Sequence, residues 1–544
     1  VHGRTPVHHD AIARHALAWA KEGPLHANEG LVHRQGWATF RTPKNVDHQH
    51  LVHLRRPNEA LPEVSDGPLD ARRARDGFSL TDKRHPRLEV ANEVDYCILC
   101  HDREKDSCRR GLVEPAPKAK PTAVAESAER GASTHPVSDP PSTGGAVITR
   151  PSKTGGIEVV DPAHVAAMHS EKPTPKIKQN PLGVPLNGCP LEERIGEMHE
   201  LRREGRVIGS LALVAIDNPM CAGTGHRICN DCMKGCIYQK QDPVNIPQAE
   251  TGALTDVLRL PWGVEIYGFL QRWNPLNARR PYALPYNGRN VLVVGLGPAG
   301  YTLSHHLVNE GFGVVGVDGL KIEPMPGALV GDAPNGLLPE PVYRYEDLEQ
   351  DLGNRRTVGF GGVAEYGITI RWDKNFNDLL ALGLMRRPNF KVYGGIRFGG
   401  TVTAEEAWEL GFDHIAIAAG AGKPTLVDIP NGLARGVRQA SDFLMALQLT
   451  GAYKRNSLAN LQVRLPAVVI GGGLTAIDCG TELAAYYVVQ CERTLDRIEK
   501  LEAERGRDAV WTAFDPEERG ILAEQVEHGR AIREERAKAG AGGR

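Results

Sequence analysis

The sequence lacks the features that mark membrane, secreted and nucleic-acid-binding proteins. No run of ~18 apolar residues occurs in the 544-residue chain, which argues against a transmembrane helix. The formal net charge of −2 indicates neither a polyanion such as nucleic acid nor an anionic membrane as a partner. The first residues lack the apolar core of a signal peptide and an initiator methionine, so we expect a cytoplasmic protein whose chain is processed or partial.

Cysteine is absent from most of the chain and concentrated in one part of it. Of the ten cysteines, only Cys479 and Cys491 stand apart from the others. A large chain without a secretion signal keeps its thiols reduced, so clustered cysteines indicate metal ligands or catalytic groups before disulfides. The predicted metal ligands are therefore Cys97, Cys100, Cys108, Cys189, Cys221, Cys229, Cys232 and Cys236.

The spacing of these cysteines is typical of iron–sulfur proteins. The two closely spaced sets are Cys97-x2-Cys100-x7-Cys108 and Cys229-x2-Cys232-x3-Cys236. Cysteines two or three residues apart can point at one centre from a tight loop, and a cysteine before proline, as at Cys189, recurs where a ligand closes a cluster. Eight ligands would serve two [4Fe–4S] clusters, and structural zinc, which also takes four thiolates, is the alternative.

A complete dinucleotide-binding fingerprint follows the cysteines. The apolar strand 290–294 leads into a G-x-G-x-x-G, Gly295-Leu296-Gly297-Pro298-Ala299-Gly300. A helix over 301–310 and a second strand that ends at Asp318 complete a βαβ unit. The helix N-terminus is expected to face a pyrophosphate, and Asp318 is expected to accept hydrogen bonds from the ribose hydroxyls.

A second, weaker fingerprint lies near the end of the chain. The apolar segment 467–470, which predicts a strand, leads into Gly471-Gly472-Gly473-Leu474-Thr475-Ala476, a G-x-G-x-x-A. No second strand with a terminal acid or arginine follows, so NAD and NADP are not distinguished, and an ordinary glycine-rich turn is the alternative. One flavin and one nicotinamide dinucleotide explain the two fingerprints together.

The predicted fold class is α/β, with a helical iron–sulfur domain followed by two Rossmann-like, doubly wound domains, the second incomplete. Composition and pattern predict these segments: 1–90, of unknown role; 91–111 and 183–260, a helical cysteine-rich domain expected to hold [4Fe–4S] clusters; 112–182, a disordered low-complexity insertion; 285–460, a first dinucleotide-binding domain, which the resemblance given below assigns to FAD; and 461–544, the start of a second one, assigned in the same way to NAD(P), with a charged helical end. The short last segment leads us to expect a C-terminally truncated chain.

Several further stretches carry a resemblance to a known family. They include Gly188-Cys189-Pro190-Leu191, Met198-His199-Glu200-Leu201, Gly361-Gly362-Val363 with Tyr366-Gly367-Ile368, 411–421 with Ala419 and Gly420, and Thr475-Ala476-Ile477-Asp478-Cys479. In this order they resemble the small subunit of bacterial glutamate synthase and the N-terminal half of dihydropyrimidine dehydrogenase, over a little more than half of the chain.

The resemblance implies FAD, NADP or NAD, two [4Fe–4S] clusters and an electron-accepting partner subunit or domain. It assigns flavin contacts to Gly362, Val363, Tyr366, Gly367, Ala419 and Gly420. In the family the fourth ligand of the second cluster varies, so Cys221 and Glu250 compete for that place. The chain departs from the family where about 80 residues separate Cys108 from Cys189.

The leading interpretation is an NAD(P)H-dependent oxidoreductase that passes electrons through FAD to the clusters and on to a partner. No residue is an obvious general acid or base, and hydride transfer to a flavin needs none. A pyridine nucleotide–disulfide reductase is one alternative, but Cys479 and Cys491 do not form the C-x-x-C that it would use. A non-catalytic scaffold or wiring subunit is the other alternative, because the second nucleotide domain is short.

Overall fold

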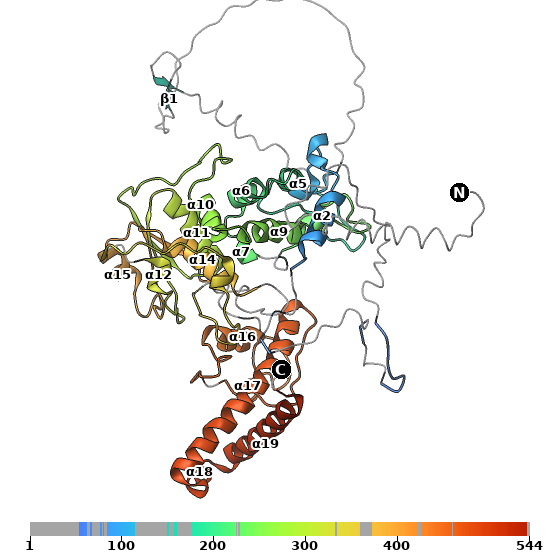
Figure 1. The fold of residues 1–544 in the computed structure, drawn as a ribbon, viewed down its shortest axis with the longest axis vertical. Coiled ribbons are helices and arrows are strands. Elements are labelled where there is room, and N and C mark those ends of the chain that lie inside the picture. Colours follow the sequence, from blue (N-terminus) through green and yellow to red (C-terminus); the bar gives the residue numbers. More distant parts are fainter. Residues whose placement is uncertain are drawn as a thin grey trace, which may run out of the picture. The chain divides into compact units, whose positions relative to one another are not determined.

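The computed structural model divides the chain into two compact units, Val1–Gly111 with Asn187–Arg544 and Leu112–Leu186 (Figure 1). The residues that it describes are 54–61, 66–67, 77–78, 80, 84–114, 149–151, 157–159, 176–224, 226, 229–331, 335–359, 373–420, 424, 426–459 and 461–540. Most of the segment 1–90, most of the insertion 112–182 and the predicted flavin loop 361–368 therefore lie outside the described residues.

A group of helices precedes the parallel sheet in the larger unit. Its longer members are α2 (Arg87–Tyr96), α5 (Ile195–Arg203), α6 (Val207–Asp217), α9 (Ile246–Leu258) and α10 (Gly263–Leu270). Helices α6 and α9 bury most of their residues and pack against each other inside the group; α6 is apolar on nearly all sides, whereas α9 also buries polar residues such as Gln248 and Asp256. Short helical turns carry several of the cysteines: η2 (Cys100–Arg103), α3 (Ser107–Arg110), α7 (Cys221–Thr224) and α8 (Asp231–Gly235).

A four-stranded parallel sheet forms the α/β part of the same unit. Its strands are β3 (Asn290–Val294), β4 (Gly313–Val317), β5 (Phe390–Tyr393) and β6 (His414–Ile417), in the order β5-β4-β3-β6. The helices between and after the first strands are α11 (Pro298–Asn309), α12 (Gly327–Val330), η4 (Tyr345–Leu348), α14 (Phe376–Met385) and α15 (Ala404–Glu409). The predicted α/β class with a parallel sheet and a helical N-terminal region is confirmed.

The end of the chain is helical and charged, as the sequence predicts. It contains α16 (Ala440–Leu449), α17 (Leu474–Arg505), α18 (Arg507–Thr512) and α19 (Pro516–Ala539). Helices α17 and α19 lie side by side (Figure 1), with apolar contacts inside and ion pairs such as Arg533–Glu499, at 2.9 Å, outside. Among the described residues, no helix is both long and apolar enough to cross a membrane.

The smaller unit, Leu112–Leu186, contains one antiparallel strand pair among its described residues. Strand β1 (Thr149–Pro151) pairs with β2 (Ile157–Val159). Isolated bridges also join Val113 to Ile177 and Gln179 to Pro185.

Candidate functional site

The first glycine-rich turn lies where the strand order of the sheet reverses. Strands β4 and β5 lie on one side of β3, and β6 lies on the other. Open parallel sheets bind their ligands in the crevice at the carboxyl ends of the strands at such a point. Just beyond β6, the backbone N–H of Ala418 donates to the carbonyl of Val294 at 2.7 Å, which holds the two strand ends together beside the turn.

The glycines of this turn have the surroundings that their expected roles require. Gly295 has a φ of +95°, and a Cβ there would lie 2.4 Å from the carbonyl oxygen of Ala418. A Cβ at Gly300 would lie 1.9 Å from the carbonyl oxygen of Gly295, because α11 packs directly on the turn. At Gly297 an added Cβ would meet no heavy atom within 4 Å, which leaves open space for a phosphate to approach the helix N-terminus.

Asp318 lies at the carboxyl end of β4, where the fingerprint predicts the ribose-binding acid. Its carboxylate accepts a hydrogen bond from the backbone N–H of Leu296 at 3.0 Å and another from Leu320 at 2.9 Å. The acid therefore also ties the turn to the second strand, and its oxygens keep lone pairs for a ligand. Ala419 and Gly420 follow β6 directly, beside this crevice, whereas the predicted contacts Gly362, Val363, Tyr366 and Gly367 lie outside the described residues.

The second glycine-rich turn forms the predicted turn and helix without the predicted strand. Gly471 has a φ of +132°, Gly473 caps α17, and Leu474, Thr475 and Ala476 begin that helix. The expected strand 467–470 is wrong, because it has no strand to pair with among the described residues after Ile417. Val468 is 88% exposed and Ile470 72% exposed, so this apolar segment does not enter a core.

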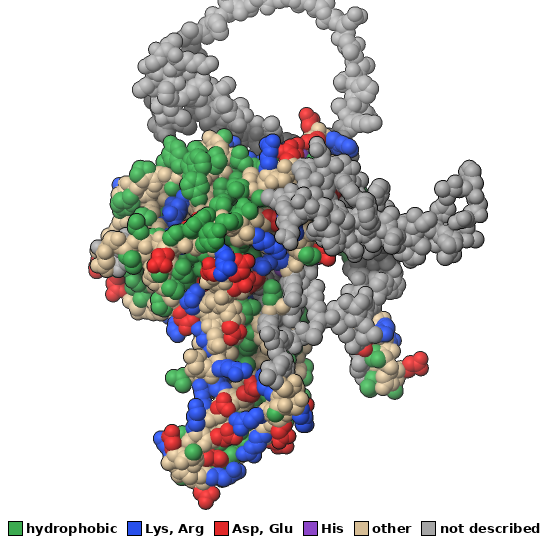
Figure 2. Space-filling model, viewed as in Figure 1, with side chains coloured by type: hydrophobic (Ala, Val, Ile, Leu, Met, Phe, Trp, Pro, Cys, Tyr) green, Lys and Arg blue, Asp and Glu red, His purple; other side chains and the backbone are tan. Residues whose placement is uncertain are grey.

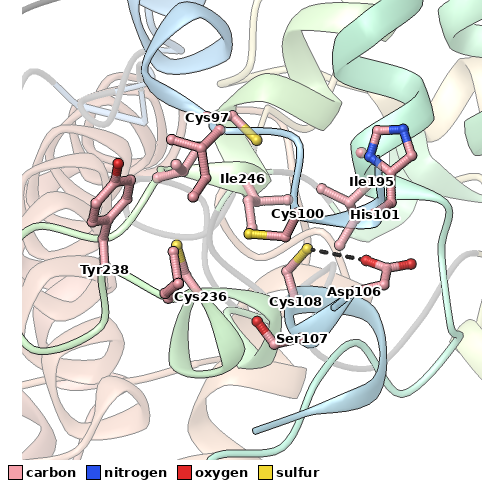
Figure 3. Close-up of a pocket in the computed structure, with 14 residues that line it drawn as sticks. Cys97, Cys100, His101, Asp106, Ser107, Cys108, Ile195, Cys236, Tyr238 and Ile246 are labelled. Carbon is pink, nitrogen blue, oxygen red and sulfur yellow. Dashed lines mark hydrogen bonds between the residues drawn. The ribbon is translucent and has the colours of Figure 1, made fainter. Parts of the chain in front are cut away.

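Four cysteines come together in one pocket, and we call them the first cysteine group (Cys97, Cys100, Cys108 and Cys236). Figure 3 shows their side chains around the pocket, with the carboxylate of Asp106 beside the Cys108 thiol, 3.6 Å from it. Burial raises the pKa of each thiol, to about 11 for Cys97, and neighbouring thiols of the group raise it further in Cys97, Cys100 and Cys108. The thiols are therefore held in the neutral form, and a metal bound among them would favour the thiolates that serve as ligands.

Arg203 on α5 fixes the segment that leads into this group. Its Nη2 donates to the backbone carbonyls of Val94, at 2.8 Å, and Asp95, at 3.2 Å, and also to that of Cys97. These carbonyls lie at the end of α2, where the helix leaves its last acceptors unpaired. Arg203 is also a cation beside Cys97, and its charge acts to lower the pKa of that thiol.

A second cysteine group (Cys189, Cys229 and Cys232) lies around two buried carboxyls. Burial raises the pKa of the Cys232 thiol, and the charges of Glu250, Cys189, Glu193 and Cys229 raise it further. Burial also raises the pKa of both Glu193 and Glu250, which share a side-chain hydrogen bond. A bound cation would lower these pKa values again and favour the ionised forms that can act as ligands.

The structure groups the cysteines differently from their spacing along the chain. Cys236 lines the pocket of the first group, although only three residues separate it from Cys232. Cys189 joins the second group across the long insertion. Cys221 is buried, and its thiol lies 3.6 Å from the hydroxyl of Tyr267.

Sequence reasoning missed Arg203, Glu193 and Asp106, whose charges shift the pKa values of Cys97, Cys189 and Cys108, respectively. Their only local signal is position, because Asp106 stands two residues before Cys108 and Glu193 stands four residues after Cys189. The other two cysteines, Cys479 and Cys491, are both buried on α17. Twelve helical residues separate them by about 18 Å, which excludes a disulfide between them.

Comparison with known proteins agrees with this arrangement. Residues 289–527 match the family described as pyridine nucleotide-disulphide oxidoreductase. An uncharacterized protein of Rickettsia prowazekii is 47% identical over 315 residues, which cover 58% of this chain and 42% of that protein. The glutamate synthase [NADPH] small chain of Mycobacterium tuberculosis is 26% identical over 308 residues, 55% of this chain and 52% of the small chain.

A further match is the glutamate synthase [NADH] of Schizosaccharomyces pombe, 24% identical over 339 residues, which cover 60% of this chain and 13% of that protein. The chain spans about half the length, or less, of the curated relatives that it matches. The matched family binds FAD and NAD(P), in agreement with the crevice at the first turn. Residues 289–527 are thus similar to the pyridine nucleotide-disulphide oxidoreductase family, and over 55% of its length the chain is similar to the glutamate synthase small chain.

Proposed function

We propose that the chain passes electrons from NAD(P)H through FAD to two [4Fe–4S] clusters and on to a partner protein, as an electron-input module. The observation that carries the proposal is the convergence of the first cysteine group on one pocket, in a chain that also carries an FAD/NAD(P) domain. Residues 91–111 and 183–260 would hold the clusters, 285–460 the FAD and 461–544 the nicotinamide nucleotide. A flavin supplies the conversion between a two-electron hydride donor and one-electron acceptors.

The residues present fit these cofactors. The open space at Gly297 and the N-terminus of α11 suit a pyrophosphate, and Asp318 suits a ribose. The first cysteine group offers four thiols, the number that a [4Fe–4S] cluster takes. The second group offers three thiols, with Glu250 as the fourth ligand in our proposal, because its carboxylate acts on Cys189, Cys229 and Cys232. Cys221, the rival, has its thiol directed at Tyr267.

The first test is an anaerobic absorbance spectrum of the purified chain, combined with iron analysis, before and after addition of NADPH or NADH. We expect flavin bands over a broad iron–sulfur shoulder, bleached by one of the nucleotides. Cys236→Ser should remove about half of the iron, whereas Cys479→Ala, a buried cysteine outside both groups, should keep it. Wild-type protein that binds zinc in place of iron would refute the electron-transfer function.

A paired substitution identifies the fourth ligand of the second group. Glu250→Gln should alter the electron paramagnetic resonance signal of one reduced cluster and leave the other signal in place. Cys221→Ala should leave both signals and the iron content unchanged. The reverse pattern would assign the ligand to Cys221.

A scaffold or wiring subunit is the second candidate, and the exposed segment 467–470 favours it. Among the described residues the apolar segment 467–470 joins no sheet, so the part of the chain that the structure describes builds no sheet crevice for a second dinucleotide there. The scaffold predicts protein that holds flavin and iron but is not reduced by NADPH or NADH. Reduction of a dye by either nucleotide, at a rate that follows flavin content, would exclude it.

A further inference from the structure

A groove with mainly apolar walls runs along α10, apart from the glycine-rich turns and the cysteine groups. Its volume is about 570 Å³, within the range of ~300–1,000 Å³ that is usual for small-molecule sites. Residues from α6, α10, α14 and the turn after α10 line it, among them Ile208, Phe269, Trp273, Leu379 and Leu382. Figure 2 shows hydrophobic side chains gathered on the face over α10.

Large side chains on this groove are exposed although they are apolar. Phe269 is 53% exposed, and Trp273 and Ile208 are each 42% exposed. The rings of Phe269 and Trp273 pack against each other with centroids 5.0 Å apart, so the wall is an ordered aromatic surface. A contiguous exposed apolar surface of this kind marks a binding site more often than isolated exposed residues do.

One cation of the groove shares its counter-charge, Glu265, with a second arginine that is hydrogen-bonded to it. Arg272 lines the groove, and its Nε is buried with no hydrogen-bond acceptor among the described residues. Burial lowers the pKa of the Arg272 guanidinium, and the positive charge of Arg386 lowers it further. An anion beside Arg272 would offset both effects.

The neighbouring carboxylate is already committed to another partner. Nη1 of Arg386 donates to both oxygens of Glu265, at 2.9 Å each, and the backbone N–H of Val342 donates to Oε1 at 2.8 Å. Arg387 adds a third guanidinium, whose Nη1 is buried without an acceptor among the described residues. Burial and then Arg272 lower the pKa of Arg387 to about 10. Arg387, whose Nη2 donates to Asn309 at 2.8 Å, is thus a further positive charge behind Arg272, while Glu265 is already paired with Arg386.

We propose that this groove binds a small amphiphilic carboxylate, a molecule with one apolar acyl or aromatic group and one carboxylate. The apolar group would lie against Phe269, Trp273 and Ile208. The carboxylate would accept hydrogen bonds from Arg272, whose planar guanidinium matches carboxylate geometry. The proposal uses none of the residues assigned to FAD, NAD(P)H or iron, so it does not depend on the proposed function.

The test on the unmodified protein compares two probes that differ only in the charged group. Decanoate and 1-decanol are titrated into the full chain by calorimetry, below the concentrations at which either aggregates. We expect saturable binding of decanoate, tighter than that of 1-decanol by roughly tenfold or more, because a hydrogen bond to a charged group contributes that much. Equal affinities, or no saturable binding of decanoate, would overturn the proposal.

Two variants locate the charge that selects the carboxylate. Arg272→Gln should bring the decanoate affinity down to that of 1-decanol and leave 1-decanol binding unchanged. Arg280→Gln is the matched control, because Arg280 is close in sequence, pairs with Glu310 at 2.6 Å and does not line the groove. Unchanged decanoate binding in a folded Arg272→Gln protein would also overturn the proposal, and the probe comparison above does not rely on any variant.

Discussion

The two glycine-rich turns have nearly the same sequence pattern and the same helix start, yet their surroundings differ. The first turn is enclosed by a parallel sheet, where Gly295 contacts Ala418 and Gly300 contacts Gly295. The second turn begins a 32-residue helix but follows an exposed segment that pairs with no described strand. The difference teaches that a short pattern specifies a helix N-terminus locally, whereas the sheet beneath it depends on partners distant in the sequence.

The largest expected effect comes from the last small residue of each fingerprint, Gly300 in the first turn and Ala476 in the second. Gly300→Ala should lower the free energy of unfolding by about 3 kcal/mol or more and abolish flavin binding, because its Cβ would collide with the backbone oxygen of Gly295. The matched change, Ala476→Gly, should lower it by at most about 1 kcal/mol, the cost of glycine in a helix. Denaturant unfolding and flavin content would show both effects, and a flavin-bound, stable Gly300→Ala protein would contradict the asymmetry.

Substitutions at the second glycine of each fingerprint, Gly297 and Gly473, separate effects on ligand binding from effects on stability. Gly297→Val and Gly473→Val both add atoms to open space, at φ values of −72° and −79° that any residue adopts. Both glycines are N-cap residues, where Val is much less favourable than Gly, so we expect each change to lower the free energy of unfolding by a similar amount, about 1 kcal/mol. Gly297→Val should reduce flavin affinity at least tenfold, whereas Gly473→Val should keep the flavin and weaken NAD(P)H reduction. Equal flavin retention in both proteins would remove the functional distinction between the turns.

The helices that follow the two turns should differ in how they affect stability at mildly acid pH, with a larger effect from α11 than from α17. His305 on α11 is buried, and burial, with His306 and Arg387, lowers its pKa to about 3. Between about pH 3 and 6.5 the unfolded chain therefore binds one proton more at His305 than the folded chain does. As the pH falls through that window, this difference lowers the free energy of unfolding by up to about 1.4 kcal/mol per pH unit. Helix α17 contains no histidine.

His305→Gln should flatten this acid dependence, while the exposed His414 provides the control substitution, His414→Gln. Denaturant midpoints measured at pH 7, 6 and 5 would show the difference in slope. Parallel slopes for wild type and His305→Gln would show that His305 titrates in the folded chain as it does in the unfolded one.

The smallest expected effect concerns an ion pair between the segments that carry the two turns. Lys454 donates to Glu323 at 2.5 Å. Burial acts to raise the pKa of Glu323, but hydrogen bonds from Lys454, Thr357 and Lys321 prevail and lower it to about 2. Because the folded pKa is depressed, this stabilisation is complete above about pH 4.3 and is lost as the pH falls toward 2.

Glu323→Gln should therefore lower the free energy of unfolding by about 1 kcal/mol at pH 7, with a smaller difference from wild type at pH 3.5. The exposed pair Lys538–Glu535 supplies the control, Glu535→Gln, for which no measurable change is expected. A loss that stays constant with pH would assign the effect to packing rather than to charge.

The sequence predicted those parts of the structure that are specified by residues close together in the chain. The first βαβ unit and the charged helical end both depend on residues close together in the chain, whereas the set of eight cysteine ligands stays a prediction and Cys221 lies outside both cysteine groups. The pairing of Cys236 with Cys97, Cys100 and Cys108 depends on how α8 packs against the segment after α2, and no spacing rule contains that information. The strand expected at 467–470 failed for the same reason, since an apolar run becomes a strand only beside a partner.

Arg203 has a consequence for the order in which the first cysteine group and the cluster that we propose for it come together. The guanidinium holds the end of α2 and the carbonyl of Cys97 through contacts made by protein atoms alone. The entropy of ordering this backbone, about 1–2 kcal/mol per residue, is therefore lost when the helices pack and not when iron arrives. On the proposed function, this part of the loop is consequently ordered before a cluster binds, and we predict that iron removed by a chelator can be restored without unfolding of the chain.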